Sequence, residues 1–136
     1  MTATVLRESY FIDLYLGEDY AAIKGLVGAS RLLIPVPDAL NADAQALRTL
    51  CEQRHQETGR NEFSCFYDGR LYRVTLSRDL MGRTSMVLRQ TPASLFDFMD
   101  IPLSTPLRKS VEHPGATGLV LIAGEMGAGK TTTAAA

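Results

Sequence analysis

Near the C-terminal end of the sequence, an eight-residue segment has the composition and spacing of a phosphate-binding loop. Residues 124–131 read Gly-Glu-Met-Gly-Ala-Gly-Lys-Thr and fit the pattern G-x-x-x-x-G-K-[ST]. Glycines permit the dihedrals that turn successive backbone N–H groups toward an anion, and the N-terminal end of a helix favours the same charge. We therefore interpret this segment as a site for nucleotide phosphates.

Individual side chains of this loop have distinct predicted roles. Lys130 is placed to reach the β- and γ-phosphates, the Thr131 hydroxyl to ligate Mg²⁺, and Thr132 to reach the α-phosphate. The alternative is a glycine-rich turn before a helix, but the apolar run 118–123 in front of the loop favours phosphate binding. The predicted nucleotide-binding residues are Gly124, Glu125, Met126, Gly127, Ala128, Gly129, Lys130, Thr131 and Thr132.

A second group of candidate residues consists of arginines upstream of the loop. They are Arg70, Arg73, Arg78, Arg83 and Arg89, accompanied in that stretch only by the acids Asp68 and Asp79. One interpretation is a solvated sheet face on which the arginine stems pack over apolar neighbours. A second is phosphate recognition, because forked guanidinium donors fit phosphate oxygens. A third is a nucleic-acid surface on which Tyr67 and Tyr72 stack bases.

The elements that must position these residues are predicted from hydrophobic periodicity and turn signals. Strands are expected at 9–16, 20–27, 31–36, 62–67, 70–77 and 83–89. Apolar residues at three- and four-residue spacing predict a helix over 41–57, capped by Asn41 or Asp38 and ended by Gly59. Asp68 and Gly69 predict a two-residue hairpin turn.

Beyond residue 90 the pattern changes. Short helices are expected at about 92–99 and 106–113, because Thr91 and Thr105 each stand before a proline suited to a first helical turn. The apolar run 118–123 predicts a strand buried on both faces of a parallel sheet. Unpaired, such a strand exposes two edges, so we expect it to be disordered, aberrantly packed or paired with another chain.

Composition excludes several classes of protein. A formal net charge of −1 argues against a bulk nucleic-acid binder. The longest apolar runs are far shorter than the roughly 18–20 residues of a membrane-spanning helix, and the N-terminus lacks the pattern of a secretory signal. Two cysteines, Cys51 and Cys65, are interpreted as core residues in a reduced cytoplasmic compartment. His55 and His113 are expected at helix C-termini as caps.

At this point the sequence resembles the secretion-type motor ATPase superfamily, which includes type IV pilus extension and retraction ATPases and type II/IV secretion ATPases. The similarity is strongest over 118–134, where G-L-V-L-I-A-G-x-x-G-A-G-K-T-T-T is close to the family's G-L-V-L-V-T-G-P-T-G-S-G-K-[ST]-T-T. Upstream, 72–74, Gly82 and 87–92 are similar to the F-R-V, G and F-R-x-[IL]-P elements. More weakly, 13–16 resembles the family's first strand.

The resemblance implies an α+β fold: a PAS-like N-terminal sheet domain with one long helix over 1–90, a helical linker over 91–117, and the first strand and P-loop of a truncated RecA-like domain over 118–136. It implies a ring hexamer with ATP and Mg²⁺ between the two domains. Arg73 and Arg89 match the family's two strand arginines near the γ-phosphate. A third falls on Met81, for which Arg78 or Arg83 would substitute.

The family's function would then be ATP hydrolysis that drives pilus assembly or retraction, or type II/IV protein secretion. The implied partner is an inner-membrane platform protein, with the motor cytoplasmic and peripheral to the inner membrane of a bacterium, and no direct nucleic acid is expected. The acidic Walker B residue would lie downstream, so this stretch alone is expected to be inactive. The alternatives are an oligomerisation or docking module without nucleotide contact, and a P-loop ATPase of DNA conjugation.

Overall fold

The computed structural model describes residues 5–91 and 97–135. Contacts divide the chain into two compact units, Met1–Ala93 and Ser94–Ala136, and each is considered by itself. The first unit carries the sheet and the long helix, and the second carries short helices and the predicted phosphate-binding loop, residues 124–131.

The first unit is built on a six-stranded antiparallel sheet with the order β3-β2-β1-β6-β5-β4. Its strands are β1 (Asp13–Leu16), β2 (Ala21–Lys24), β3 (Leu33–Pro35), β4 (Glu62–Tyr67), β5 (Arg70–Arg78) and β6 (Thr84–Gln90). β1 pairs with β6, so the first and last strands of the unit meet in the middle of the sheet. This central pairing is the contact that local sequence patterns did not indicate.

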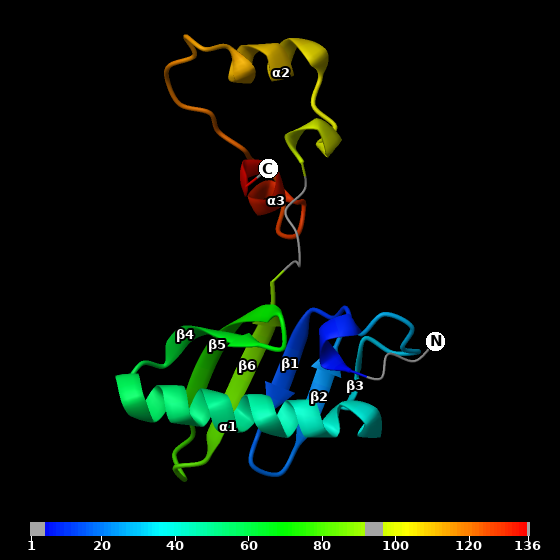
Figure 1. Cartoon of the computed structure of the whole chain (residues 1–136), viewed down its shortest axis with the longest axis vertical. Coiled ribbons are helices and arrows are strands. Elements are labelled where there is room, and N and C mark those ends of the chain that lie inside the picture. Colours follow the sequence, from blue (N-terminus) through cyan, green and yellow to red (C-terminus); the bar gives the residue numbers. More distant parts are fainter. Residues whose placement is uncertain (1–4, 92–96, 136) are drawn as a thin grey trace. The chain divides into compact units, whose positions relative to one another are not determined.

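One face of the sheet is covered by the helix α1 (Asn41–Thr58), which runs across the strands in Figure 1. Residues at period two on β5, namely Tyr72, Val74 and Leu76, are buried on this face. The helix contributes Leu47 and Cys51, which are both fully buried. The predicted helical spacing and strand alternation are therefore confirmed, and the core lies between α1 and the sheet.

The C-terminal end of α1 agrees with the prediction, whereas its N-terminal cap does not. Gly59 ends the helix in the left-handed conformation with φ +66°, as predicted. The predicted cap by Asn41 or Asp38 is wrong: Leu40 occupies the cap position and no side chain caps the helix. A 3₁₀ turn, η2 (Asp38–Leu40), leads directly into α1, so Asp38 lies one turn too early.

Several strand boundaries also moved. The strand expected at 9–16 is confined to β1, because a 3₁₀ turn, η1 (Leu6–Glu8), precedes it. The strand expected at 31–36 is reduced to the three residues of β3. The hairpin turn between β4 and β5 is confirmed, with φ of 44° at Asp68 and 78° at Gly69.

The second unit contains η3 (Phe98–Asp100), α2 (Thr105–Glu112) and α3 (Lys130–Ala135). Most of the helix predicted at 92–99 lies outside the described residues. Ser104, not Thr105, stands at the cap position of α2, and its side chain makes no capping bond. Arg108 fastens the segment before α2 to that helix, donating to the carbonyl oxygens of Phe98 at 2.7 Å and Ile101 at 2.6 Å.

The strand predicted at 118–123 is not formed. The segment is exposed, and no described strand of this chain pairs with it. Apolar residues that would be buried between neighbouring strands are open instead, with Leu119 82% and Leu121 81% exposed. A strand exists only where a neighbour takes up its backbone hydrogen bonds, so the sequence pattern alone could not produce it.

Candidate functional site

The face of the sheet opposite α1 carries the candidate arginines. Side chains alternate along a strand, so the residues between the buried positions of β5 and β6 project to this open face. Arg73 on β5 pairs in register with Arg89 on β6, and Arg89 pairs with Asp13 on β1. Asp13 in turn pairs with Lys24 on β2, so the row holds three cations and one carboxylate across four adjacent strands. Asp13, Arg73 and Arg89 line a shallow hollow of about 290 Å³ together with Thr75 and Val87.

Arg89 is held in place by Asp13. Its Nε donates to Asp13 Oδ1 at 2.9 Å and its Nη2 donates to Oδ2 at 3.3 Å. The Asp13 side chain is 4% exposed whereas the Arg89 side chain is 67% exposed, so a buried carboxylate anchors a guanidinium that faces solvent. This hydrogen-bonded carboxylate raises the pKa of Arg89. The guanidinium stays charged, with Nη1 available for another acceptor.

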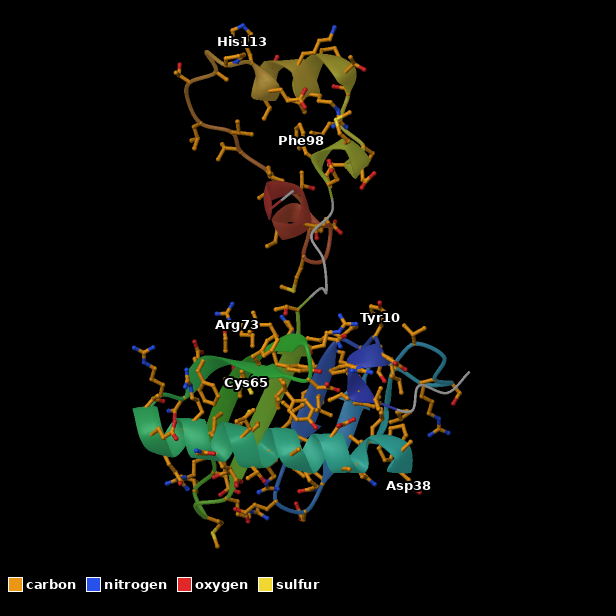
Figure 2. The ribbon with its side chains drawn as sticks, in the orientation of Figure 1. Tyr10, Asp38, Cys65, Arg73, Phe98 and His113 are labelled. Carbon is orange, nitrogen blue, oxygen red and sulfur yellow. The ribbon has the colours of Figure 1, made fainter. Side chains whose placement is uncertain are left out.

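Arg73 has no such anchor. Its side chain is exposed, and among the described residues it takes part in no ion pair. Arg73 is labelled in Figure 2. Like charges directly opposite each other on neighbouring strands are destabilising, and here Arg73 lies opposite Arg89 in a row with a single carboxylate. The row consequently carries more positive than negative charge, which is the local condition for attracting an anion.

The other arginines lie elsewhere. Arg83 is fastened to Asp79 at the β5–β6 turn, with Nε 2.8 Å from Oδ2, and Arg78 lies exposed at the same end of β5. Arg78 lies five positions beyond Arg73 along β5, a span of about 17 Å. Arg70 is buried on the face toward α1, and its guanidinium lies over the Tyr10 ring at 5.0 Å.

The interpretation as a base-stacking surface meets a contradiction at one of its residues. Tyr72 is fully buried in the core between the sheet and α1, so its ring cannot stack on a base. Burial also raises the pKa of its hydroxyl to about 12. Tyr67 is half-buried and donates to Asp43 Oδ1 at 2.8 Å, which occupies its hydroxyl. The tyrosines therefore serve the core and the helix start.

In the second unit, the phosphate-loop segment forms a tight turn that leads into α3. Gly127 and Gly129 have φ of 81° and 87°, a region that side chains disfavour, and no atom lies within 4 Å of a Cβ added at either position. The N–H of Ala128 donates to the carbonyl oxygen of Glu125 at 3.2 Å, closing the turn. Both glycines are thus required by backbone conformation and not by crowding.

Lys130 is folded back onto this turn. Its Nζ donates to the carbonyl oxygens of Gly124 at 2.9 Å and Glu125 at 2.6 Å. The Thr133 hydroxyl is used within the helix, donating to the Gly129 carbonyl at 3.1 Å, whereas the Thr131 side chain is exposed. The ammonium group therefore lies over the loop, held by neutral acceptors only.

Sequence reasoning missed Asp13 as a site residue. The arginine stretch contains no acid that could hold Arg89, because the partner comes from a strand 76 residues away in the sequence. The available signal was a carboxylate within the otherwise apolar β1, at a position that alternation assigns to the face opposite Leu14 and Leu16. Only the β1–β6 pairing turns that signal into an ion pair.

Two general features of the described residues complete the picture. None of their helices is long and apolar enough to cross a membrane. Within 5–91 and 97–135, no group of three or more His, Cys, Asp or Glu side chains is arranged to hold a metal ion.

No protein-family model and no curated protein matches the sequence. The chain is similar to a solved structure described as the pilus retraction motor PilT with bound ADP. The fold is shared with that motor. The TM-score is 0.63 at 23% sequence identity, and the match covers 92% of this chain and 37% of the PilT chain. This likeness supports, for the fold, the resemblance to the secretion-type motor ATPases.

Proposed function

We propose that this chain is part of an ATP-hydrolysing motor of the secretion-type superfamily, which powers pilus assembly or retraction, or type II/IV protein secretion. The observation that carries the proposal is the row formed by Asp13, Arg89 and Arg73 on the open face of a PilT-like sheet. In this proposal the two arginines supply donors to the terminal phosphate of ATP.

The chemistry of the row suits that role. Asp13 fixes one edge of the Arg89 guanidinium and leaves Nη1 free, so a phosphate oxygen meets a donor whose direction is already set. Arg73 has its full set of donors available beside it. Two guanidinium groups next to one carboxylate gain more from a phosphate, with its several negative oxygens, than from water. The arrangement therefore stabilises negative charge that develops on a transferring phosphoryl group.

The side chains of the predicted phosphate-binding loop suit the binding of a nucleoside triphosphate with Mg²⁺. Lys130 Nζ is held by two neutral carbonyl oxygens, and a charged phosphate oxygen is a stronger acceptor than either. The exposed Thr131 hydroxyl would ligate the metal. Mg²⁺, when bound with ATP, neutralises charge on the β- and γ-phosphate oxygens. Thr132 would contact the α-phosphate.

The proposal extends to the assembly. We propose a ring hexamer that acts on an inner-membrane platform protein from the cytoplasmic side of a bacterial inner membrane. This chain spans 37% of the PilT chain that it matches, and the acidic residue that holds Mg²⁺ in P-loop ATPases would come from the remainder of the motor.

The deciding experiment measures ATP hydrolysis by the intact motor. Lys130→Ala should abolish nucleotide retention, whereas Arg73→Gln and Arg89→Gln should lower kcat by roughly 100-fold or more while ATP is still bound. Arg31→Gln is the matched control, because Arg31 is an exposed arginine of the same unit outside the row. It should hydrolyse ATP at the unmodified rate.

Assembly must be recorded in parallel by sedimentation or light scattering. The proposal requires oligomer formation to survive in Arg73→Gln and Arg89→Gln. Full hydrolysis with loss of assembly would instead identify the sheet domain as an oligomerisation or docking module. Full hydrolysis with intact assembly would exclude the arginines from both roles.

A further inference from the structure

The charged row on the open face ends in a lysine of β2, at a position that no sequence motif marks. Lys24 pairs in register with Asp13 of β1 on one side and with Leu33 of β3 on the other. Its side chain is half-buried. Because the neighbour on β3 is apolar, Asp13 is the one in-register partner that could neutralise Lys24. Lys24 therefore stands at one end of the charged row, and Arg73 stands at the other.

The Asp13 carboxylate is already occupied by other donors. Arg89 donates to Oδ1 at 2.9 Å and to Oδ2 at 3.3 Å, and the Tyr15 hydroxyl donates to Oδ2 at 3.4 Å. Opposite charges on facing strands stabilise a sheet when they pair. Among the residues that the structure describes, however, the Lys24 ammonium takes part in no ion pair. Its three donors are thus available to an acceptor from outside the sheet.

Two unpaired cations consequently flank one internal ion pair. Across the four strands the order is Arg73, Arg89, Asp13 and Lys24, and the charges of Arg89 and Asp13 cancel each other. The remaining charges of Arg73 and Lys24 lie on the same face of the sheet. An anion that binds between them meets attraction from both ends of the row.

The spacing of the row suits an anion that bears several charges. Three steps between strands separate Lys24 from Arg73, about 14 Å between their backbones. Each side chain extends roughly 6 Å from the backbone on a flexible stem. The two charged ends can therefore converge from opposite sides on one anion above the Arg89–Asp13 pair. Lys24 does not line the hollow that Asp13, Arg73 and Arg89 share, but it stands one strand beyond Asp13 at the edge of that hollow.

We propose that Lys24 is a further phosphate-contacting residue, which reaches the anion bound by Arg89 from the side opposite Arg73 and favours linked phosphates over a single phosphate. The inference rests on the proposed function, because it takes the row as the place where the terminal phosphate of ATP binds. An ammonium is a mobile point charge, whereas the guanidinium of Arg89 has donors of fixed direction. Lys24 therefore contributes affinity for a long anion, and Arg89 contributes its orientation.

The test measures the binding of tripolyphosphate to the full chain by isothermal titration calorimetry, with inorganic phosphate for comparison. Every protein carries Lys130→Ala, because the predicted phosphate-binding loop would also bind these anions. Lys24→Gln should weaken the binding of tripolyphosphate by roughly fivefold or more, and that of phosphate by less. Lys24→Arg retains the charge and should stay within about twofold of the parent. Lys109→Gln removes an exposed lysine of α2 and should change neither affinity.

The two arginines separate this inference from the proposed function. If Arg73→Gln and Arg89→Gln weaken the binding of tripolyphosphate but Lys24→Gln does not, Lys24 is excluded and the arginines keep their role. If none of the three changes weakens binding, the open face is not a phosphate site and both proposals fail. Equal losses of affinity for phosphate and tripolyphosphate in Lys24→Gln would overturn the preference for linked phosphates.

A purely structural role for Lys24 is tested without an anion. Because Lys24 makes no ion pair with Asp13, Lys24→Gln should shift the melting temperature by less than about 4 °C in the absence of phosphate. A fall as large as that in Arg89→Gln would show that Lys24 serves the Asp13 carboxylate instead, and would refute the inference.

Chemical modification of the unaltered chain avoids any effect of substitution on folding. Acetic anhydride acetylates accessible amines, and mass spectrometry of the digested protein reports the extent of acetylation at Lys24 and Lys109. Saturating tripolyphosphate should slow acetylation of Lys24 by roughly threefold or more and leave Lys109 unaffected, because a bound anion covers the ammonium and favours its protonated form. Equal protection of the two lysines, or none at Lys24, would refute the contact.

Discussion

The Asp13–Arg89 ion pair joins a buried carboxylate to an exposed guanidinium, and this asymmetry leads to a measurable prediction. Arg89→Met keeps an apolar stem on β6 but removes the guanidinium. It leaves the Asp13 carboxylate, which is 4% exposed in the unaltered chain, without its ion-pair partner. Such a group cannot recover full hydration, so the folded state should lose stability.

The magnitude follows from the geometry. Hydrogen bonds to charged groups contribute about 1.5–3 kcal/mol, and breaking a fully buried ion pair costs about 3–5 kcal/mol. The Arg89 side chain is 67% exposed, so water can approach the vacated position and the lower range applies, about 2 kcal/mol. Relief of the repulsion from Arg73 returns about 0.5 kcal/mol. The net loss of about 1.5 kcal/mol should lower the melting temperature by on the order of 10 °C.

The assay is urea unfolding of the full chain, followed by far-UV circular dichroism. Arg83→Met is the matched control, because Arg83 Nε lies 2.8 Å from Asp79 but that carboxylate is 41% exposed. The free energy of unfolding should fall clearly less in Arg83→Met than in Arg89→Met. Asp13→Asn combined with Arg89→Met should cost less than the sum of the single changes. Equal losses for the two arginine variants, or strict additivity, would show that burial of Asp13 does not control the pair.

Three further predictions concern the sheet domain, and urea unfolding checks each of them. The hydrogen bond to Asp43 raises the pKa of Tyr67 to about 12, above its unfolded value of about 10. The stabilisation that this hydrogen bond gives the folded state is therefore complete below pH 10 and is lost as the pH rises toward 12. Tyr67→Phe should make stability fall less over that interval. Leu47→Ala, at a fully buried position of α1, should cost about 2–5 kcal/mol. Gly59→Ala should cost about 1 kcal/mol, because φ is +66° there while no atom crowds the added Cβ.

The sequence was sufficient for those elements whose signals are local. The 18-residue α1 and the hairpin between β4 and β5 depend on periodicity and on turn residues with positive φ, which are properties of short segments. The sequence was not sufficient where an element forms only beside a neighbouring strand. Residues 118–123 have the composition of a buried strand, yet they form none because no described strand of this chain lies beside them.

The site was predictable to a similar extent. Residue type indicated a group of five arginines, and the family resemblance singled out Arg73 and Arg89. The electrostatic difference between these two depends on β1 joining β6, a pairing between distant segments. The two cysteines were correctly predicted as core residues. In each case burial could be inferred from the pattern along one element, whereas the identity of the contacting residue required the packing of two.

The arrangement of charge on the open face also bears on why both arginines are present. A fold selected for stability alone would gain from an acid or a neutral residue opposite Arg89, because cross-strand pairs of opposite charge stabilise a sheet and like pairs weaken it. Arg73 occupies that position instead, exposed and without a carboxylate of its own among the described residues. Sites that bind anions commonly sacrifice some stability for function. Arg73 would weaken the sheet when no anion is bound but strengthen the binding of a phosphate. An added anion should therefore raise the free energy of unfolding, and Arg73→Gln should reduce that increase.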